Sequence, residues 1–394
     1  MSHRFALASA VVALASCLTA SSLPASGDDL AGAQESQQAG AQIEVCFVLD
    51  TTGSMSGLIE GAKAKIWSIA NQMIAAKPTP RLKIALVGYR DRGDEYVTKV
   101  YDLSDDIDAV YARLREFQAA GGGDTPESVN QALHEAVHRI GWSSSRDVLK
   151  IIFLVGDCPP HMDYSGDIKY TETCQAAVKK DLIINTIQCG SHAETTLIWQ
   201  DIARLAEGKY VAIGQTGDMQ VLATPMDAEL AELNVAIGKT LIPFGGSELR
   251  EGVARKQLAA ECATPATVAD RLAYNAAVGR TVQGAGELVD ALRAGMVKLE
   301  EVPEKDLPPE LQRLTLRERA AFVQQKAEER QKLQQRVDEL LRQRQTYIDT
   351  QLRKLSATGQ GNGFDAQVAQ LLREQAGKKG IRYLQPDAGE TVKP

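Results

Sequence analysis

The chain of 394 residues has a formal net charge of −7, and only 5% of its residues are aromatic. This balance argues against a nucleic-acid-binding protein, which needs a clustered basic face and aromatic side chains on which bases stack. With 44% hydrophobic and 24% charged residues, the composition is that of a globular chain of two or three domains, which excludes collagen-like, fully disordered and multi-span membrane proteins.

Residues 1–25 have the pattern of a signal peptide. His3 and Arg4 precede an apolar run over residues 5–15, which has the length of a signal-peptide core and is too short to span a bilayer as a helix. We therefore predict an exported chain that is periplasmic, secreted or bound to the cell envelope, with no transmembrane helix in its mature form.

The end of the apolar run offers two ways of processing. Leu14-Ala15-Ser16-Cys17 resembles the lipobox of bacterial lipoproteins, in which the cysteine receives the lipid anchor. Ala31-Gly32-Ala33 is a competing site for ordinary signal cleavage. A lipid anchor at Cys17 and a lipid-free protein therefore both remain open. Residues 26–41, rich in Ala, Ser, Gly and Gln, are predicted to form a flexible linker in either case.

Between residues 42 and 225, short apolar runs alternate with helical stretches, which is typical of α/β winding. Strands are predicted at 43–50, 82–91, 96–103, 148–157, 182–190 and 209–213, and the helices between them include 105–117 and 126–140. Almost every strand is apolar on both faces, as expected for strands that helices cover on both sides. The predicted fold class is a doubly wound, mostly parallel sheet with one antiparallel strand.

The second half of the chain is predicted to be helical. Residues 226–305 form one helical region, 306–356 a long amphipathic helix rich in Arg, Glu, Gln and Leu, and 357–394 a short helix at 366–376 with a tail. The apolar stripe of the long helix comprises Leu333, Val337, Leu340, Leu341, Ile348, Leu352 and Leu355. A strict heptad places Arg330, Gln334 and Arg344 at core positions, which disfavours a long coiled coil. A helical hairpin and a partner-binding helix remain open.

Three loops contain oxygen ligands at or near predicted strand ends, where ligands bind in open α/β sheets. Asp50, Thr52 and Ser54 follow the first strand at alternating positions, Thr125 lies in a glycine loop, and Asp157 ends the fourth strand. Each residue alone has a simpler explanation as a helix cap or a turn former. Together, carboxylates and hydroxyls without a His or Cys cluster favour a hard cation, Mg²⁺ first, with Mn²⁺ or Ca²⁺ as alternatives.

These three segments, in this order, resemble a von Willebrand factor type A (VWA) domain with its metal-ion-dependent adhesion site. The family's D-x-S-x-S motif matches Asp50, Thr52 and Ser54, with threonine in place of the middle serine. Its loop threonine and later strand-end aspartate match Thr125 and Asp157. The resemblance implies a binding module rather than an enzyme, in which a carboxylate of a protein partner completes the coordination of the cation.

An enzymatic alternative comes from one helix. His134, Glu135 and His138 match the H-E-x-x-H motif of zinc peptidases, with Glu135 as the base. Such a site needs a third ligand. Ser144 stands where the extended motif has histidine, and Glu172 falls on a separate predicted helix. A metal-dependent hydrolase therefore remains the alternative to the binding module.

The cysteines give a further prediction. Cys46 lies within the first apolar strand and is expected to behave as a small buried hydrophobe. Cys158, Cys174 and Cys189 fall near strand ends or helix starts and are expected to cluster near the metal loops. Because oxidising conditions favour pairing in an exported protein, we expect a Cys174–Cys189 disulfide, with Cys158–Cys174 as the alternative.

Overall fold

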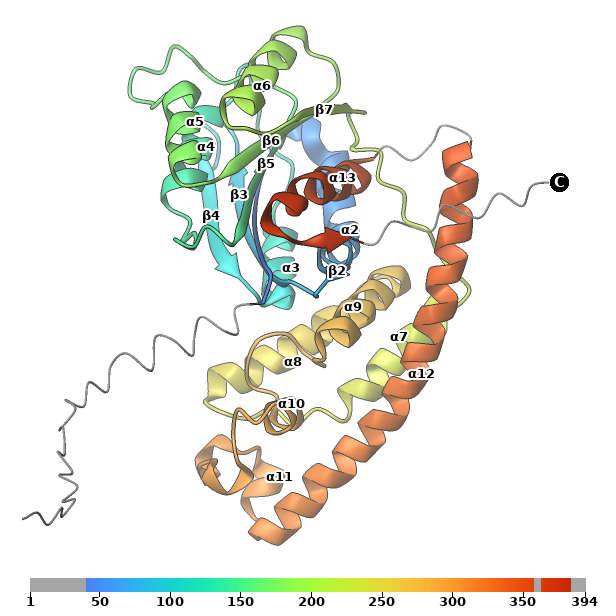
Figure 1. The fold of residues 1–394 in the computed structure, drawn as a ribbon. Helices are drawn as coiled ribbons and strands as arrows, with labels where there is room; N and C mark the ends of the chain where they lie inside the picture. Colours follow the sequence, from blue (N-terminus) through green and yellow to red (C-terminus); the bar gives the residue numbers. More distant parts are fainter. Residues whose placement is uncertain (1–39, 358–362, 384–394) are drawn as a thin grey trace, which may run out of the picture. The chain divides into compact units, whose positions relative to one another are not determined.

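The computed structural model describes residues 40–357 and 363–383 (Figure 1). The predicted signal peptide, Cys17 and all of the predicted linker except its last two residues lie outside this part of the chain, so these assignments stay predictions. Among the described residues, no helix is both long enough and apolar enough to cross a membrane.

A six-stranded sheet forms the α/β part of the chain. Its strands are β1 (Gln42–Asp50), β3 (Arg81–Tyr89), β4 (Thr98–Ser104), β5 (Leu149–Gly156), β6 (Ile183–Cys189) and β7 (Tyr210–Ile213). They lie in the order β4-β3-β1-β5-β6-β7, and each pair is parallel except β3 with β4. The predicted fold class, a mostly parallel sheet with one antiparallel strand, is confirmed.

Helices cover both faces of this sheet (Figure 1). One face packs against α2 (Ser56–Ile74) and α3 (Ile107–Glu116), and the other against α4 (Val129–His138), α5 (Tyr170–Lys179) and α6 (Ala193–Leu205). The central strand β1 contributes to both cores, because successive side chains of a strand point to opposite faces of the sheet. Phe47 and Leu49 lie in the core under α2, whereas Cys46 and Val48 lie in the core under α4.

Residues 363–383 return to the α/β part. Helix α13 (Phe364–Ala376) packs beside α2 (Figure 1), and its Phe364 ring lies 6.0 Å from that of Phe47. Gln375 of the same helix exchanges two hydrogen bonds, of 2.7 and 3.0 Å, with Asn185 of β6. Strand β8 (Arg382–Tyr383) then pairs with β2 (Ala76–Lys77). The short helix was predicted, but its place in the core was not.

The remaining helices form a layer of their own. They are α7 (Asp227–Gly238), α8 (Ser247–Glu261), α9 (Pro265–Val278), α10 (Leu288–Arg293), α11 (Pro309–Gln312) and α12 (Leu316–Ala357). Val337 and Leu340 of α12 are buried against α7 and α9, so this part of the predicted apolar stripe packs within the chain. Leu352 is exposed, and the side chain of Leu355 lies outside the described part.

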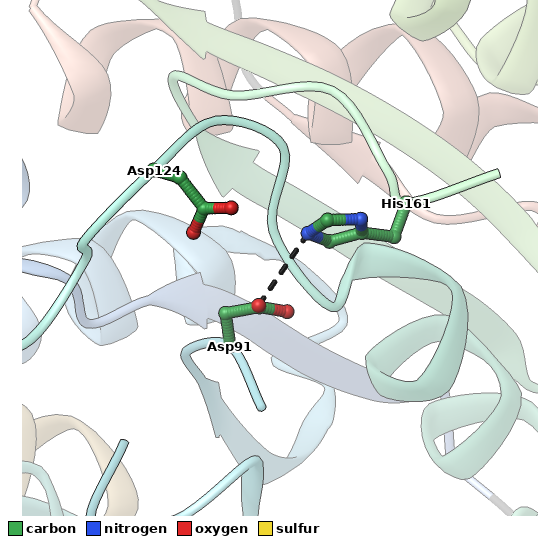
Figure 2. A group of neighbouring side chains, drawn as sticks. All are labelled: Asp91, Asp124 and His161. Atoms are coloured by element: carbon green, nitrogen blue, oxygen red, sulfur yellow. Dashed lines mark ion pairs between the residues drawn. The ribbon is translucent and has the colours of Figure 1, made fainter. Parts of the chain in front are cut away.

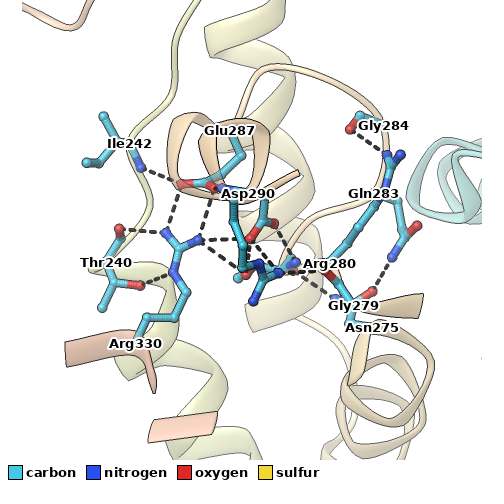
Figure 3. A network of polar contacts seen from close by, with 12 residues as sticks. Thr240, Ile242, Asn275, Gly279, Arg280, Gln283, Gly284, Glu287, Asp290 and Arg330 are labelled. Carbon is cyan, nitrogen blue, oxygen red and sulfur yellow. Dashed lines mark hydrogen bonds and ion pairs between the residues drawn. The ribbon is translucent and has the colours of Figure 1, made fainter. Parts of the chain in front are cut away.

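Buried arginines on α12 fill positions that a coiled coil would give to apolar side chains. Figure 3 shows the Arg330 guanidinium between Glu287, at 2.8 and 2.9 Å, and the carbonyl and hydroxyl oxygens of Thr240, at 2.8 and 3.0 Å. About four helical turns further along α12, Arg344 pairs with Asp227 and Asp270. These charges are therefore neutralised within the chain.

Candidate metal centre

The loop after β1 brings three oxygen ligands together. Asp50 is fully buried, and its Oδ1 accepts hydrogen bonds from the backbone nitrogen of Thr52, at 2.8 Å, and from its hydroxyl, at 2.7 Å. The Thr52 hydroxyl lies 3.3 Å from that of the exposed Ser54. The Thr52 side chain makes no capping hydrogen bond to the short helical turn that follows. The simpler explanation of Thr52 as a helix cap therefore fails.

Asp157 meets this group because β5 is the neighbour of β1 in the sheet. Burial first, and then the charge of Asp157, raise the pKa of Asp50 to about 7. Asp50 Oδ2 and Asp157 Oδ1 are both buried and accept no hydrogen bond from any residue that the structure describes. The other Asp157 oxygen accepts a hydrogen bond of 2.7 Å from Gln215, in the loop after β7. Two buried carboxylate oxygens are thus left without a donor at this acidic centre.

The glycine loop lies against the Asp50–Ser54 loop. The backbone nitrogen of Gly53 donates to the carbonyl of Gly121 at 3.2 Å, and a Cβ at Gly122 would lie 3.2 Å from Cβ of Thr52. Thr125 follows in the same loop, with an exposed side chain. In the described part of the chain, no hydrogen bond joins this side chain to Asp50, Thr52 or Asp157. The structure thus groups four of the five predicted ligands and leaves Thr125 in the adjoining loop.

Glu127 belongs to the same acidic centre, although it was not among the predicted ligands. It is buried, and within residues 40–357 and 363–383 nothing donates a hydrogen bond to its Oε2. Burial first, and then the charges of Asp50, Asp91, Asp94 and Asp157, raise its pKa to about 9. Its backbone pairs with Pro159 and His161 at 2.9 and 3.0 Å, which holds residues 126–128 outside α4. The sequence pattern had placed them in a helix.

The neighbourhood of Asp50 is thus a set of carboxylates in which three buried oxygens have no donor among the described residues. Burying a carboxylate without donors or an opposite charge is costly. A divalent cation removes this cost and prefers oxygen ligands of the kind found here. The donor set therefore fits a hard cation.

Residues 44–219 match the family model described as the von Willebrand factor A domain. This segment is a VWA domain. VWA domains are modules often used for protein–protein interaction. Proteins that contain them are generally not enzymes by virtue of this domain. The helical layer that follows lies outside the matched residues.

Curated relatives match the chain over part of its length. The putative ariadne-like RING finger protein R811 of Acanthamoeba polyphaga mimivirus is 22% identical over 203 residues, which is 47% of this chain and 19% of that protein. VWA domain-containing protein 7 of Rattus norvegicus is 35% identical over 135 residues, which is 34% of this chain and 15% of that protein. The chain thus matches less than a fifth of the length of these relatives.

Solved structures with similarity to the chain include two VWA proteins. The SpRpn10 VWA domain matches with a TM-score of 0.34 at 15% identity, over 45% of this chain and 89% of that one. A von Willebrand factor type A protein from Catenulispora acidiphila matches with a TM-score of 0.35 at 16% identity, over 55% of this chain and 43% of that one.

The H-E-x-x-H motif of the VWA domain is not arranged as a zinc site. The rings of His134 and His138 lie 4.4 Å apart on α4, but Glu135 accepts a hydrogen bond of 2.8 Å from Thr98 and pairs with Arg139. Within residues 40–357 and 363–383, neither histidine belongs to a group of three close ligand atoms from His, Cys, Asp or Glu. The zinc peptidase alternative is therefore not favoured.

The predicted disulfide is wrong. All five cysteines of the described part are free thiols. Cys174 lies in the core under α4, where its Sγ contacts the carbonyl of Ile202 at 3.7 Å, whereas Cys189 lies in the core under α2. The sheet separates them, because a strand-end residue can point to either face and the sequence did not reveal which. Cys158 likewise pairs with neither of them.

Proposed function

We propose that the VWA domain binds a protein partner through a divalent cation, Mg²⁺ first, held by Asp50, Thr52, Ser54, Thr125 and Asp157. The observation that supports this most strongly is a pair of buried oxygens close to two hydroxyl groups. These oxygens, Asp50 Oδ2 and Asp157 Oδ1, accept no hydrogen bond from the described residues. Mn²⁺ or Ca²⁺ would suit the same oxygen ligands.

The chain's own residues prepare this centre in two ways. Asp50 fixes the Thr52 hydroxyl, and Gln215 fixes Asp157, so the ligand oxygens are oriented in advance. Without a cation, this acidic centre offers a partner's carboxylate no positive charge to bind. When bound, the cation supplies the positive charge to which such a carboxylate binds. Recognition would therefore depend on the metal, and no catalytic step is proposed.

The sequence also indicates in which compartment this binding takes place. We propose that the chain acts outside the cytoplasm, on the basis of the signal-peptide pattern in residues 1–25. Cell fractionation tests export, and the mass of the mature N-terminus distinguishes a lipid on Cys17 from cleavage after residue 33. A full-length chain found only in the cytoplasm would contradict the proposal.

Thermal unfolding in Mg²⁺ tests the cation site. A ligand that binds only the native state raises its stability by about 2.7 kcal/mol at a concentration 100 times its dissociation constant. We expect the unfolding midpoint of the wild type to rise with Mg²⁺, and Asp50→Ala and Asp157→Ala to abolish that rise. The exposed Asp105→Ala, at the far end of β4, serves as the control. A wild type that shows no shift with Mg²⁺, Mn²⁺ or Ca²⁺ would refute the site.

A further inference from the structure

A second cluster of ligating side chains lies at the same edge of the VWA sheet (Figure 2). Asp91 follows β3, Asp124 lies in the glycine loop, and His161 lies in the loop after β5. One ligand atom of each lies within 4.8 Å of the others. None of the three belongs to the predicted Mg²⁺ ligands.

His161 is held in the orientation of a metal ligand. The residue is 6% exposed, and its Nδ1 lies 2.8 Å from a carboxylate oxygen of Asp163. Its ring stacks on that of Tyr164 at 4.0 Å. Nε2 makes no hydrogen bond in the described part of the chain and faces Asp91, 3.4 Å from Oδ2 (Figure 2). Metal-binding histidines almost always have this arrangement, with one ring nitrogen bonded to a carboxylate or carbonyl and the other free for the metal.

Asp91 is fixed in the same way. It is 5% exposed, and its two oxygens accept hydrogen bonds of 2.7 Å from the hydroxyls of Ser128 and Tyr164. The Tyr164 ring is itself covered by the Arg92 guanidinium at 4.0 Å. Each Asp91 oxygen accepts one hydrogen bond and retains a lone pair for a cation. The site is therefore pre-oriented by its surroundings.

We propose that Asp91, Asp124 and His161 bind a divalent transition-metal ion such as Zn²⁺ or Mn²⁺, at a second site separate from the Asp50 centre. The imidazole distinguishes it from the first site, since carboxylate ligands alone suit Mg²⁺ or Ca²⁺ and an added imidazole favours transition metals. Asp124 is exposed, so the coordination positions left by three protein ligands open to solvent. No residue of this site is shared with the proposed Mg²⁺ site.

Titration of the full-length protein with Co²⁺, in saturating Mg²⁺, tests the proposal. Co²⁺ stands in for Zn²⁺, and its visible absorption reports the number and geometry of its ligands. We expect one Co²⁺ per chain, about 100-fold weaker binding in His161→Ala and Asp124→Ala, and about 10-fold weaker binding in Asp163→Asn, which loses the carboxylate behind the imidazole. Asp50→Ala should retain Co²⁺ binding, which separates this test from that of the Mg²⁺ site.

The matched controls are His138→Ala, an exposed histidine of the H-E-x-x-H motif, and Asp105→Ala. A wild type that binds no Co²⁺ in saturating Mg²⁺ would overturn the proposal. So would unchanged affinity in both His161→Ala and Asp124→Ala, or a loss of binding in His138→Ala instead. If His161→Ala does not fold, the exposed Asp124→Ala decides the question in either direction, because its side chain supports no packing.

Discussion

Glu127 makes the acidic centre sensitive to pH. Its pKa is raised from the ordinary value of 4.5 to about 9 in the folded protein, with burial as the main cause. A raised pKa means that the folded state holds its proton more tightly than the unfolded state does. The stability this gives is complete below about pH 4.5 and is lost as the pH rises towards 9. Without a cation, the VWA domain should therefore become less stable across this range.

Glu127→Gln should remove much of this loss. In EDTA at pH 8, we expect the variant to be more stable than the wild type by about 2 kcal/mol or more, since one unit of pKa difference corresponds to about 1.4 kcal/mol. Urea unfolding at pH 5 and pH 8 measures the effect, and the exposed Glu172→Gln is the control. Equal pH dependence in wild type and Glu127→Gln would contradict the prediction.

The sequence predicted part of the two acidic clusters. Asp50, Thr52 and Ser54 were recognisable because one short loop holds them at alternating positions. Glu127, Asp91 and His161 were not, because each depends on how separate loops meet: Glu127 on its backbone pairing with the loop after β5, and His161 on the direction of its ring. The sequence did place Glu127 two positions after Thr125 in the glycine loop, and this was a signal that it could join the acidic centre.

The buried ion pair between Arg330 of α12 and Glu287, just before α10, holds the long helix in place. Arg330→Ala leaves the buried carboxylate of Glu287 without its partner, and we expect a loss of about 3–5 kcal/mol in the free energy of unfolding. Urea unfolding measures it. Arg336, also on α12, forms an exposed ion pair with Glu229 of α7. Arg336→Ala should therefore change the free energy of unfolding little.

A double-mutant cycle measures how strongly Arg330 and Glu287 are coupled. If Glu287 and Arg330 are coupled, Glu287→Ala combined with Arg330→Ala should cost much less than the sum of the two single changes, because no buried charge is left alone. Additive losses would show that Arg330 acts through packing of its side chain and that the pairing is incidental.

Elements were predicted best where local pattern determines them. Most strands of the sheet are largely apolar runs, and each observed strand begins and ends within two residues of its predicted bounds. The packing of α12 was harder to predict, because a helix rich in arginine has the pattern of a solvent-exposed one. Its buried arginines pair with Glu287 and Asp227, which are distant in sequence. Residues 366–376 have the pattern of any short amphipathic helix, and nothing local identifies the face that they cover.

For the whole molecule, we predict that the VWA segment depends on α13. A fragment of residues 40–225 exposes the face of Phe47 and α2 that Phe364, Val368 and Leu372 cover in the full chain. We expect it to unfold at a lower temperature and to bind hydrophobic dyes, since each large apolar side chain contributes about 1.5–3 kcal/mol when buried. Joining residues 363–383 to the fragment by a flexible linker should restore the midpoint; an unchanged midpoint in the fragment alone would contradict this.

The return of residues 363–383 to the sheet also determines when the domain can be completed. The Tyr383 hydroxyl donates to the carbonyl of Met73, 310 positions earlier in the chain. At about 5–20 residues per second, a ribosome needs on the order of ten seconds to make the helical layer in between. During that interval the nascent sheet has one apolar face without its last helix. A chaperone that covers this face would protect the chain until residues 363–383 have been made.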